Sequence, residues 1–139
     1  MHNKVGITLI AGSLLLGGCV APYVPAPGEA IAQVNLSVLS GPVFMCRGGQ
    51  NNRLSQDGQG YAQVPAGARV SIEESYMASN GTYSYSCSPG VSFQPEASKH
   101  YAMSFDLRDG MCYASLFRED DSTPTGLALE PSVGRPYCK

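Results

Sequence analysis

The sequence has no tryptophan, only two histidines and few charged residues, which make up 14% of its 139 positions. Its lysines and arginines form no cluster, and this excludes the basic footprint of a nucleic-acid-binding protein. No segment repeats apolar residues at i, i+3 and i+4 over about ten positions, so no confident amphipathic helix is predicted. The longest apolar run, Val5–Leu16, has 12 residues. It is shorter than the roughly 20 residues that a membrane-spanning helix requires.

Residues that commonly catalyse reactions are scarce as well. His100 is the only histidine after residue 18, and the alternation of its segment places it on the polar face, where a solvated histidine is expected. Glu73 and Glu74 are adjacent, so on a strand their side chains point to opposite faces and cannot act as a pair. We therefore predict that the protein is not an enzyme and that it has no cofactor.

Two acidic features remain to be explained. Glu74 shares the apolar face of its segment, so it either ends a strand or is a buried carboxylate paired with an arginine such as Arg69 or Arg118. The run Glu119–Asp121 is typical of a solvated turn and occasionally of a calcium-binding corner. Neither feature predicts a catalytic site.

The opening segment has the layout of a secretory signal, with "MHNK" followed by the apolar run and the small residues Gly17 and Gly18. A cysteine follows at once, and "LGGC", Leu16–Cys19, resembles the lipobox of bacterial lipoproteins. The resemblance implies that residues 1–18 are a cleaved signal peptide and that Cys19 becomes an acylated first residue. Two or more acyl chains anchor a protein stably, so the membrane is an expected partner.

Val20 follows the cysteine, where an aspartate would by analogy retain an enterobacterial lipoprotein at the inner membrane. The resemblance therefore implies the outer membrane, with the protein facing the periplasm. Residues 20–32, "VAPYVPAPGEAIA", contain three closely spaced prolines, which favour an extended conformation. We interpret residues 19–32 as the acylated cysteine and a Pro-rich tether, and residues 33–139 as a single domain.

Beyond Cys19, an even number of cysteines remains: Cys46, Cys87, Cys112 and Cys138. Because the periplasm is oxidising, this number predicts two disulfides. The spacings of 41, 25 and 26 residues include no C-x-x-C pair, so no metal site is predicted. Four cysteines allow three connectivities. We favour the sequential one, Cys46–Cys87 with Cys112–Cys138, because it gives the simplest topology.

Alternating apolar and polar residues predict strands throughout the domain. Such patterns occur in "QVNLSV", "RVSIEESYM", "TYSYSCS", "MCYASLFRE" and "GLALEP". The clearest is "KHYAMSFDL", whose shared face holds Tyr101, Met103, Phe105 and Leu107. Turn sequences separate these runs, and Asp109-Gly110 is a hairpin signal. We predict an all-β fold, a small antiparallel β-sandwich or barrel of about seven to eight short strands.

Two segments are candidate binding loops. The polar stretch Cys46–Gly60 is long for a compact domain, and such loops are often functional or mobile, although a flexible hairpin tip is an equal alternative. The second is "SYMASNGTYSYSC", whose Tyr83 and Tyr85 we assign to core packing together with Tyr101. Tyrosine beside Ser, Asn and Gly suits recognition of proteins or glycans. The candidate binding residues are Asn51, Asn52, Arg53, Tyr76, Ser79, Asn80 and Gly81.

The segment "SNGTY", Ser79–Tyr83, is similar to the Ser-Gly-x-x-Tyr loop of membrane-anchored inhibitors of c-type lysozymes, which are small β-barrel lipoproteins with a disulfide. Here Asn80 stands between Ser79 and Gly81, and the lysine-bearing second loop of that family has no counterpart. We predict a non-enzymatic outer-membrane lipoprotein that acts as an envelope binding or accessory module, with an envelope protein as its partner. The alternative is an inhibitor of a host or competitor hydrolase such as c-type lysozyme.

Overall fold

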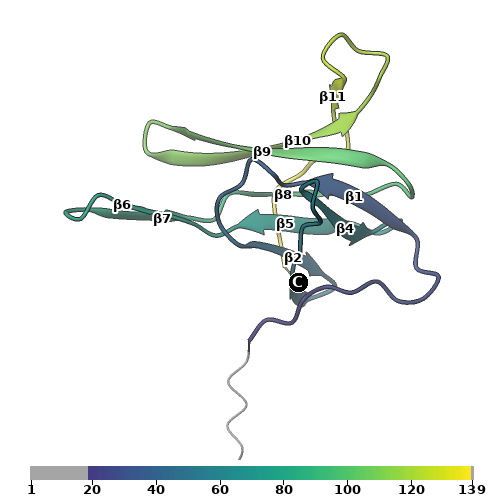
Figure 1. Ribbon diagram of the computed structural model, residues 1–139, viewed down its shortest axis with the longest axis horizontal. Coiled ribbons are helices and arrows are strands. Elements are labelled where there is room, and N and C mark those ends of the chain that lie inside the picture. Colours follow the sequence, from purple (N-terminus) through teal and green to yellow (C-terminus); the bar gives the residue numbers. More distant parts are fainter. Residues whose placement is uncertain (1–18, 139) are drawn as a thin grey trace, which may run out of the picture.

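The structure, a computed structural model, describes residues 19–138 and is built from strands and turns (Figure 1). The predicted signal peptide, residues 1–18, lies outside the described residues. The all-β prediction is confirmed. The strands are β1 (Ile31–Asn35), β2 (Val43–Arg47), β3 (Gln50–Arg53), β4 (Tyr61–Pro65), β5 (Val70–Glu74), β6 (Tyr76–Ser79), β7 (Ser84–Cys87), β8 (Gly90–Phe93), β9 (His100–Arg108), β10 (Met111–Glu119) and β11 (Leu127–Leu129).

The described strands form three sheets. The largest has the order β11-β10-β9-β1-β4, the second has the order β3-β2-β5-β8, and β6 pairs with β7 alone. All of these pairs are antiparallel except β1 with β9, which are parallel. The predicted seven to eight antiparallel strands were therefore too few. Short strands such as β2, β3 and β8 lack a long alternating pattern, and the run "RVSIEESYM" is divided between β5 and β6.

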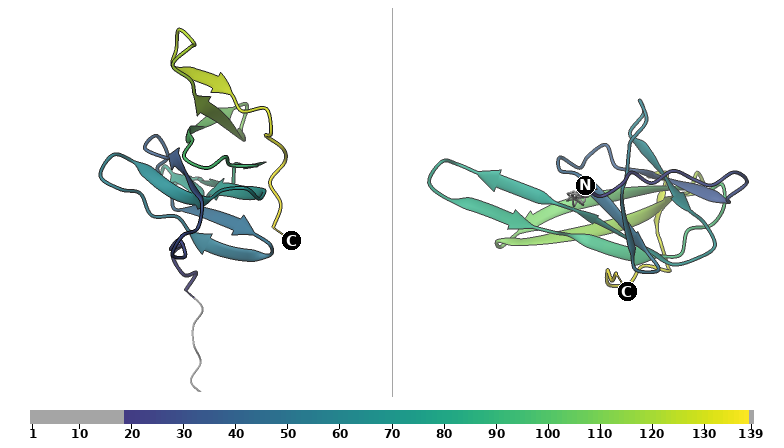
Figure 2. Two further views of the ribbon diagram at one scale, coloured as in Figure 1. Left: turned by 90° about the vertical axis from the view of Figure 1, so that its right-hand side faces the viewer. Right: turned by 90° about the horizontal axis from the view of Figure 1, so that it is seen from below.

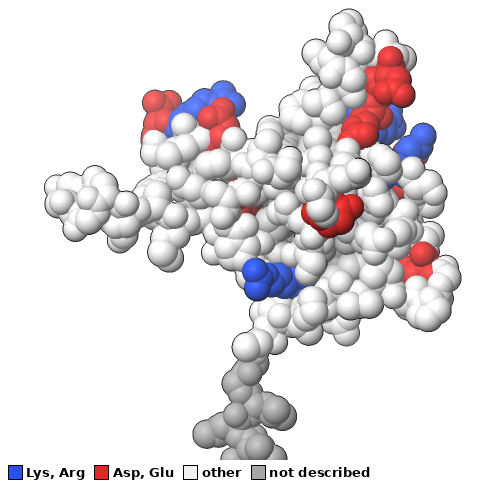
Figure 3. All heavy atoms as spheres, in the orientation of Figure 1, with Lys and Arg blue, Asp and Glu red and all other residues white. Residues whose placement is uncertain are grey.

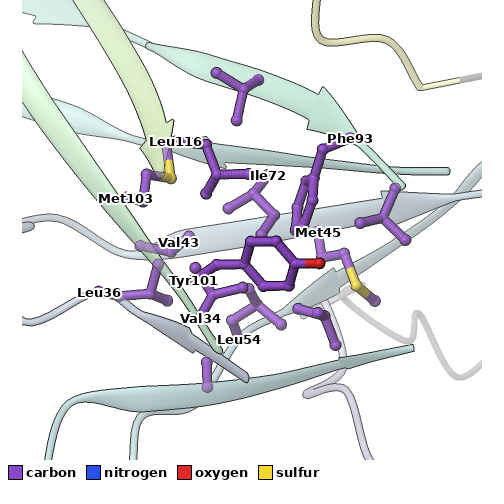
Figure 4. Packing of buried hydrophobic residues seen from close by; sticks show 14 of the residues in the cluster. Val34, Leu36, Val43, Met45, Leu54, Ile72, Phe93, Tyr101, Met103 and Leu116 are labelled. Carbon is purple, nitrogen blue, oxygen red and sulfur yellow. The ribbon is translucent and has the colours of Figure 1, made fainter. Parts of the chain in front are cut away.

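The core lies between the two larger sheets, as expected of a β-sandwich (Figure 4). Alternation in β9 turns Tyr101 and Met103 inward, where they are fully buried. The ring of Tyr101 meets that of Phe93 from β8 edge-on, at 5.0 Å between centroids. Burial raises the pKa of Tyr101, and its hydroxyl accepts the backbone N–H of Glu96 at 3.0 Å. The core thus joins the two sheets through residues that were predicted to share one face.

One long hairpin is bent where β5 gives way to β6. β5 pairs with β8 in the second sheet, whereas β6 and β7 continue the hairpin outside it. Ser75 stands at the bend, and its N–H bonds to the carbonyl of Pro42 at 2.9 Å. The side chain of Glu74 is fully buried at the same point. The bend directs β6 and β7 away from the body of the domain.

The two predicted disulfides are present, but their connectivity differs from the expected sequential one. Cys46 pairs with Cys138, and Cys87 pairs with Cys112. The register explains the first bond, because Cys46 lies opposite Ser71 on the outer face of the second sheet. The second bond joins β7 to β10, two strands of different sheets. Pairing therefore follows the contacts between elements rather than the order of the cysteines.

Residues 130–138 form a strap across the outer face of the second sheet, ending at the Cys46–Cys138 bond. Gly134 pairs with Ser92 at the free edge of β8, through hydrogen bonds of 2.9 and 2.7 Å. Further along, the hydroxyl of Ser71 bonds to both the carbonyl and the N–H of Tyr137. The strap thereby buries Ser71 and Ser92, which point away from the core.

Candidate binding surface

Two hairpins project from the body in the same direction and form what we call the two-hairpin arm, residues 76–87 and 104–115 (Figure 1). The first hairpin is β6 with β7. The second is the outer half of β9 and β10, because β9 pairs with β1 only through residues 100–102 and β10 pairs with β11 only through residues 117–119. Beyond those points β9 and β10 pair with each other alone. Only the base of the second hairpin, through Phe105 and Ala114, packs against the core.

The inner faces of the two hairpins are held together by covalent and noncovalent contacts. The Cys87–Cys112 disulfide joins the base of the first hairpin to the second hairpin close to its turn. The ring of Tyr76 packs on that of Phe105 at 4.8 Å between centroids. Tyr85 donates its hydroxyl hydrogen to the carbonyl of Gly110, at 2.7 Å, in the turn of the second hairpin. These contacts make the arm a two-layered, braced unit.

The end of the first hairpin is a turn organised by Asn80. Its Oδ1 accepts the backbone N–H groups of Thr82, at 3.0 Å, and Tyr83, at 2.8 Å. Gly81 has a φ of +85°, a conformation that side chains disfavour. A shallow hollow of about 270 Å³ lies between Ala78, Tyr83 and Tyr85 at this end. The turn therefore presents Tyr83 on a preorganised backbone.

The first hairpin of the arm carries an exposed apolar surface and no charged side chain, whereas Asp106, Arg108 and Asp109 lie near the end of the second hairpin. Tyr83 is 77% exposed and Met77 is 76% exposed. From residue 75 to residue 95 the sequence has no charged side chain, and the lower projection in Figure 3 is correspondingly free of blue and red. Exposed apolar residues that gather on a protrusion are typical of an interaction surface. Further large side chains of the arm that are at least two-fifths exposed are Leu107, Met111 and Tyr113.

Sequence reasoning identified this surface only in part. Ser79, Asn80 and Gly81 do lie at the end of the arm, but Tyr76 is half-buried against the second hairpin. The assignment of Tyr83 to the core was wrong, whereas Tyr101 is in the core. The residues missed were Met77, Leu107, Met111 and Tyr113. The alternating pattern predicts on which face of its strand each of these residues lies. It does not predict where a hairpin projects beyond the rest of the domain.

The other candidate loop, Cys46–Gly60, contains a strand, β3. Gly48 and Gly49, both with positive φ, form a tight turn, and the chain then returns as β3 alongside β2. Asn51, Asn52 and Arg53 are therefore strand residues, as their pairing with β2 requires. The polar composition suggested a loop because β3 is a short strand with no apolar face of its own.

Residues 21–23 of the predicted tether are attached to the free edge of β3. The N–H of Arg53 bonds to the carbonyl of Ala21, and the carbonyl of Arg53 accepts the N–H of Tyr23, both at 2.9 Å. Pro22 lies between them and pairs in parallel with Arg53. The segment is Pro-rich as predicted, but from Ala21 onward it is not a free spacer.

A second set of contacts fixes the tether beyond this edge. Glu29 accepts hydrogen bonds from Arg47 at 2.7 Å, from the Tyr23 hydroxyl at 2.9 Å and from the Ala26 N–H at 3.0 Å. These donors lower the pKa of the Glu29 carboxyl, with Arg47 contributing most. Partial burial, followed by the bond to Glu29, raises the pKa of Tyr23 to about 12.

His100 is exposed, as expected, and lies on the outer face of the first sheet. Its Nδ1 is 3.5 Å from Oε2 of Glu119, and its ring packs against Tyr61 at 5.5 Å between centroids. The Tyr61 hydroxyl donates to Oε1 of Glu119, which raises the pKa of Tyr61. Within residues 19–138 no hydrogen bond joins His100 to a serine, threonine or cysteine, so this cluster does not have the geometry of a nucleophile and its base.

Glu74 is buried, but its partner is not an arginine. Its Oε1 accepts the backbone N–H groups of Ser40, at 2.9 Å, and Gly41, at 2.7 Å. Its Oε2 has no hydrogen-bond partner among the described residues. The carboxylate thus fastens the 40–42 segment to the bend where the arm begins, which is a structural task.

No group of three or more His, Cys, Asp or Glu side chains is arranged to hold a metal ion within residues 19–138. In the same range no helix is long and apolar enough to cross a membrane. The two-hairpin arm and the docked tether are therefore the candidate functional features of the described residues. Comparison of the chain with protein-family models, with curated proteins and with solved structures gives no match.

Proposed function

We propose that the protein is a non-enzymatic outer-membrane lipoprotein, anchored through acylated Cys19, that binds an envelope protein with the end of its two-hairpin arm. The observation that carries the proposal is the arm itself, whose exposed Tyr83 and Met77 have no charged neighbour in residues 75–95. A large, rigid side chain such as that of Tyr83, held on a braced protrusion, loses little conformational freedom when a partner covers it.

Two independent features support placing this binding module in the bacterial envelope. The first 19 residues have the order of a lipoprotein signal, with a lysine, an apolar run, two glycines and a cysteine. Two disulfides require an oxidising compartment to form. The acyl chains that the lipobox implies would hold the protein at a membrane, most simply the outer membrane facing the periplasm.

The test is photocross-linking in living cells, with a benzophenone side chain in place of Thr82, an exposed residue of the turn, and, as the matched control, of Thr125 in the exposed turn before β11. We expect one dominant protein adduct from position 82, absent from position 125 and diminished by Tyr83→Ala. No adduct from position 82, in cells where the protein is acylated and oxidised, would reject an envelope partner for the arm.

A second candidate function is inhibition of a hydrolase such as c-type lysozyme. It is favoured by the position of "SNGTY" at the end of a projecting arm, where Tyr83 is exposed and Asn80 orders the turn. An inhibitory loop must reach into an enzyme cleft, and a projecting turn has that shape. Purified lipoprotein in detergent should then slow c-type lysozyme, and Tyr83→Ala should relieve the inhibition. Full lysozyme activity at an excess of the lipoprotein would reject this candidate.

A further inference from the structure

The attachment of the tether to β3 limits how far the domain can lie from its anchor. Cys19 is separated from Ala21, the first residue hydrogen-bonded to β3, by Val20 alone. Two residues of extended chain span at most about 7 Å. If Cys19 carries acyl chains, as the proposed function states, β3 must lie at the level of the lipid headgroups.

The surface around this attachment has the chemistry of a headgroup contact. A hollow of about 380 Å³ lies beside Pro22 and is lined by Val20, Gly41, Pro42, Arg53 and Leu54, among others. Arg53 is the only charged residue in its lining. The Arg53 side chain is exposed and has no ion-pair partner within residues 19–138. A guanidinium is well suited to a phosphate group.

Acidic groups lie at the other end of the molecule. The run Glu119–Asp121 leads into the loop before β11, which stands opposite the start of the described chain in Figure 1 and in the left view of Figure 2. Near the tether, Glu29 is paired with Arg47, whereas Arg53 beside Pro22 is a cation with no ion pair among the described residues, which is the sign that an anionic lipid surface attracts. In Figure 1 the two-hairpin arm extends sideways from the line that joins these two ends.

We propose that the edge formed by residues 21–23 and β3 is a membrane-contacting surface, on which Arg53 meets the phosphates of phospholipid headgroups. The inference rests on the proposed acylation of Cys19. It adds an orientation to the proposed function, since a domain seated on this edge directs its arm along the membrane rather than away from it. A partner of the arm would then lie in, or close to, the same membrane.

The test uses the full lipidated protein in vesicles of phosphatidylethanolamine and phosphatidylglycerol. A benzophenone side chain replaces Asn51, an exposed residue of β3, or Thr125 at the opposite end. After irradiation we expect phospholipid adducts from Asn51 and none above background from Thr125, detected as mass shifts. Equal adducts at both positions, or none at Asn51, would overturn the proposed orientation.

The role of Arg53 is tested by a matched pair of charge reversals. One cationic side chain changes binding to an anionic surface about fivefold. Arg53→Glu removes this cation and adds an anion, so it should reduce the Asn51 adduct by at least about fivefold. Arg108→Glu makes the same charge change at the end of the arm and should leave the adduct unaltered. An adduct that Arg53→Glu does not reduce would overturn the phosphate contact.

The acylation of Cys19 is measured first, so that a protein without acyl chains can be distinguished from an acylated protein in another orientation. Mass spectrometry of the mature N-terminus and flotation with vesicles report whether Cys19 is acylated. An unacylated protein that does not float would overturn both the anchor and the orientation. An acylated, floating protein with no preference for Asn51 would overturn the orientation alone.

Discussion

Oε1 of Glu74 accepts the backbone N–H of Gly41 at 2.7 Å, although 33 residues separate the two in the sequence. The contact lies at the bend between β5 and β6, where the two-hairpin arm leaves the body. The carboxylate accepts the N–H of Ser40 as well, and the carbonyl of Pro42 accepts the N–H of Ser75. The buried side chain of Glu74 thus accepts two backbone hydrogen bonds from a loop and holds this loop against the bend where the arm begins.

Removing this carboxylate should destabilise the domain. Glu74→Ala removes the carboxylate that accepts the N–H groups of Ser40 and Gly41. Each hydrogen bond to a charged group contributes about 1.5–3 kcal/mol. We expect a loss of about 2–5 kcal/mol in the free energy of unfolding, measured by urea denaturation. Glu74→Gln is the control, because its amide oxygen can still accept both bonds. Equal stability of the two variants would contradict the role given to the carboxylate.

A methyl group at Gly41 should be nearly as harmful, for a steric reason. A Cβ built at this position would lie 2.1 Å from the carbonyl oxygen of Ser75 and 3.3 Å from Oε1 of Glu74. The backbone would have to move, and overpacking of this kind typically costs about 1–3 kcal/mol. Gly67→Ala is not a suitable control because its φ is positive. Gly58→Ala is a suitable control, since a Cβ at this position would meet nothing within 4 Å. This variant should leave the melting temperature unchanged.

The Cys87–Cys112 disulfide should hold the arm together as well as stabilise the fold. In the chain-entropy model a loop of this length, 25 residues, contributes ~3.5 kcal/mol. Cys87→Ser with Cys112→Ser should therefore lower the free energy of unfolding and speed amide exchange in β6 and β7 while β1 and β4 stay protected. Tyr85→Phe keeps the disulfide and removes one hydrogen bond, so it should cost only about 1 kcal/mol. Unchanged exchange in β6 and β7 of the double variant would show that other contacts brace the arm.

The sequence predicts local structure well where one face of a strand is buried. In β9, Tyr101 and Met103 alternate with partly exposed residues and enter the core as expected. The strand β3 was not predicted, because its side chains, Gln50–Arg53, are polar on both faces. Strand pairing there is specified by the turn at Gly48 and Gly49 and by the partner strands, neither of which leaves an alternating pattern.

Long-range pairings were harder to predict than strands. The local pattern predicts on which face of a strand a cysteine lies. The strap that brings Cys138 to Cys46 has no alternating pattern, so their disulfide was not predicted. The attachment of the tether to β3 was also not predicted, since proline is normally unfavourable within a β-sheet. Pro22 is tolerated because the bonds to β3 use the carbonyl of Ala21 and the N–H of Tyr23. Its missing N–H lies on the open side of an edge strand.

The attachment of the tether should weaken in acid, because it depends on the charged form of Glu29. Arg47, the Ala26 N–H and the Tyr23 hydroxyl hold the pKa of this carboxyl below its ordinary value of 4.5. The stabilisation is therefore present above pH 4.5 and is lost as the pH falls through the lowered, folded-state pKa. Amide exchange at Tyr23 and Arg53, corrected for intrinsic rates, should accelerate in that range. Glu29→Gln should show faster exchange at neutral pH and little acid dependence, and a wild-type-like acid profile in this variant would contradict the assignment.

At the alkaline end the attachment should depend on the Tyr23 phenol. Partial burial, with the bond to Glu29, raises its pKa from 10.0 to about 12, so the folded protein favours the neutral form. The stabilisation is complete below pH 10 and is lost as the pH rises towards about 12. Absorbance titration of phenolate should show a late-titrating group that is missing in Tyr23→Phe, and Glu29→Gln should shift that group to lower pH. If Tyr23→Phe removes a tyrosine that titrates near 10, the phenol is solvated and residues 21–23 are not held by the contacts described.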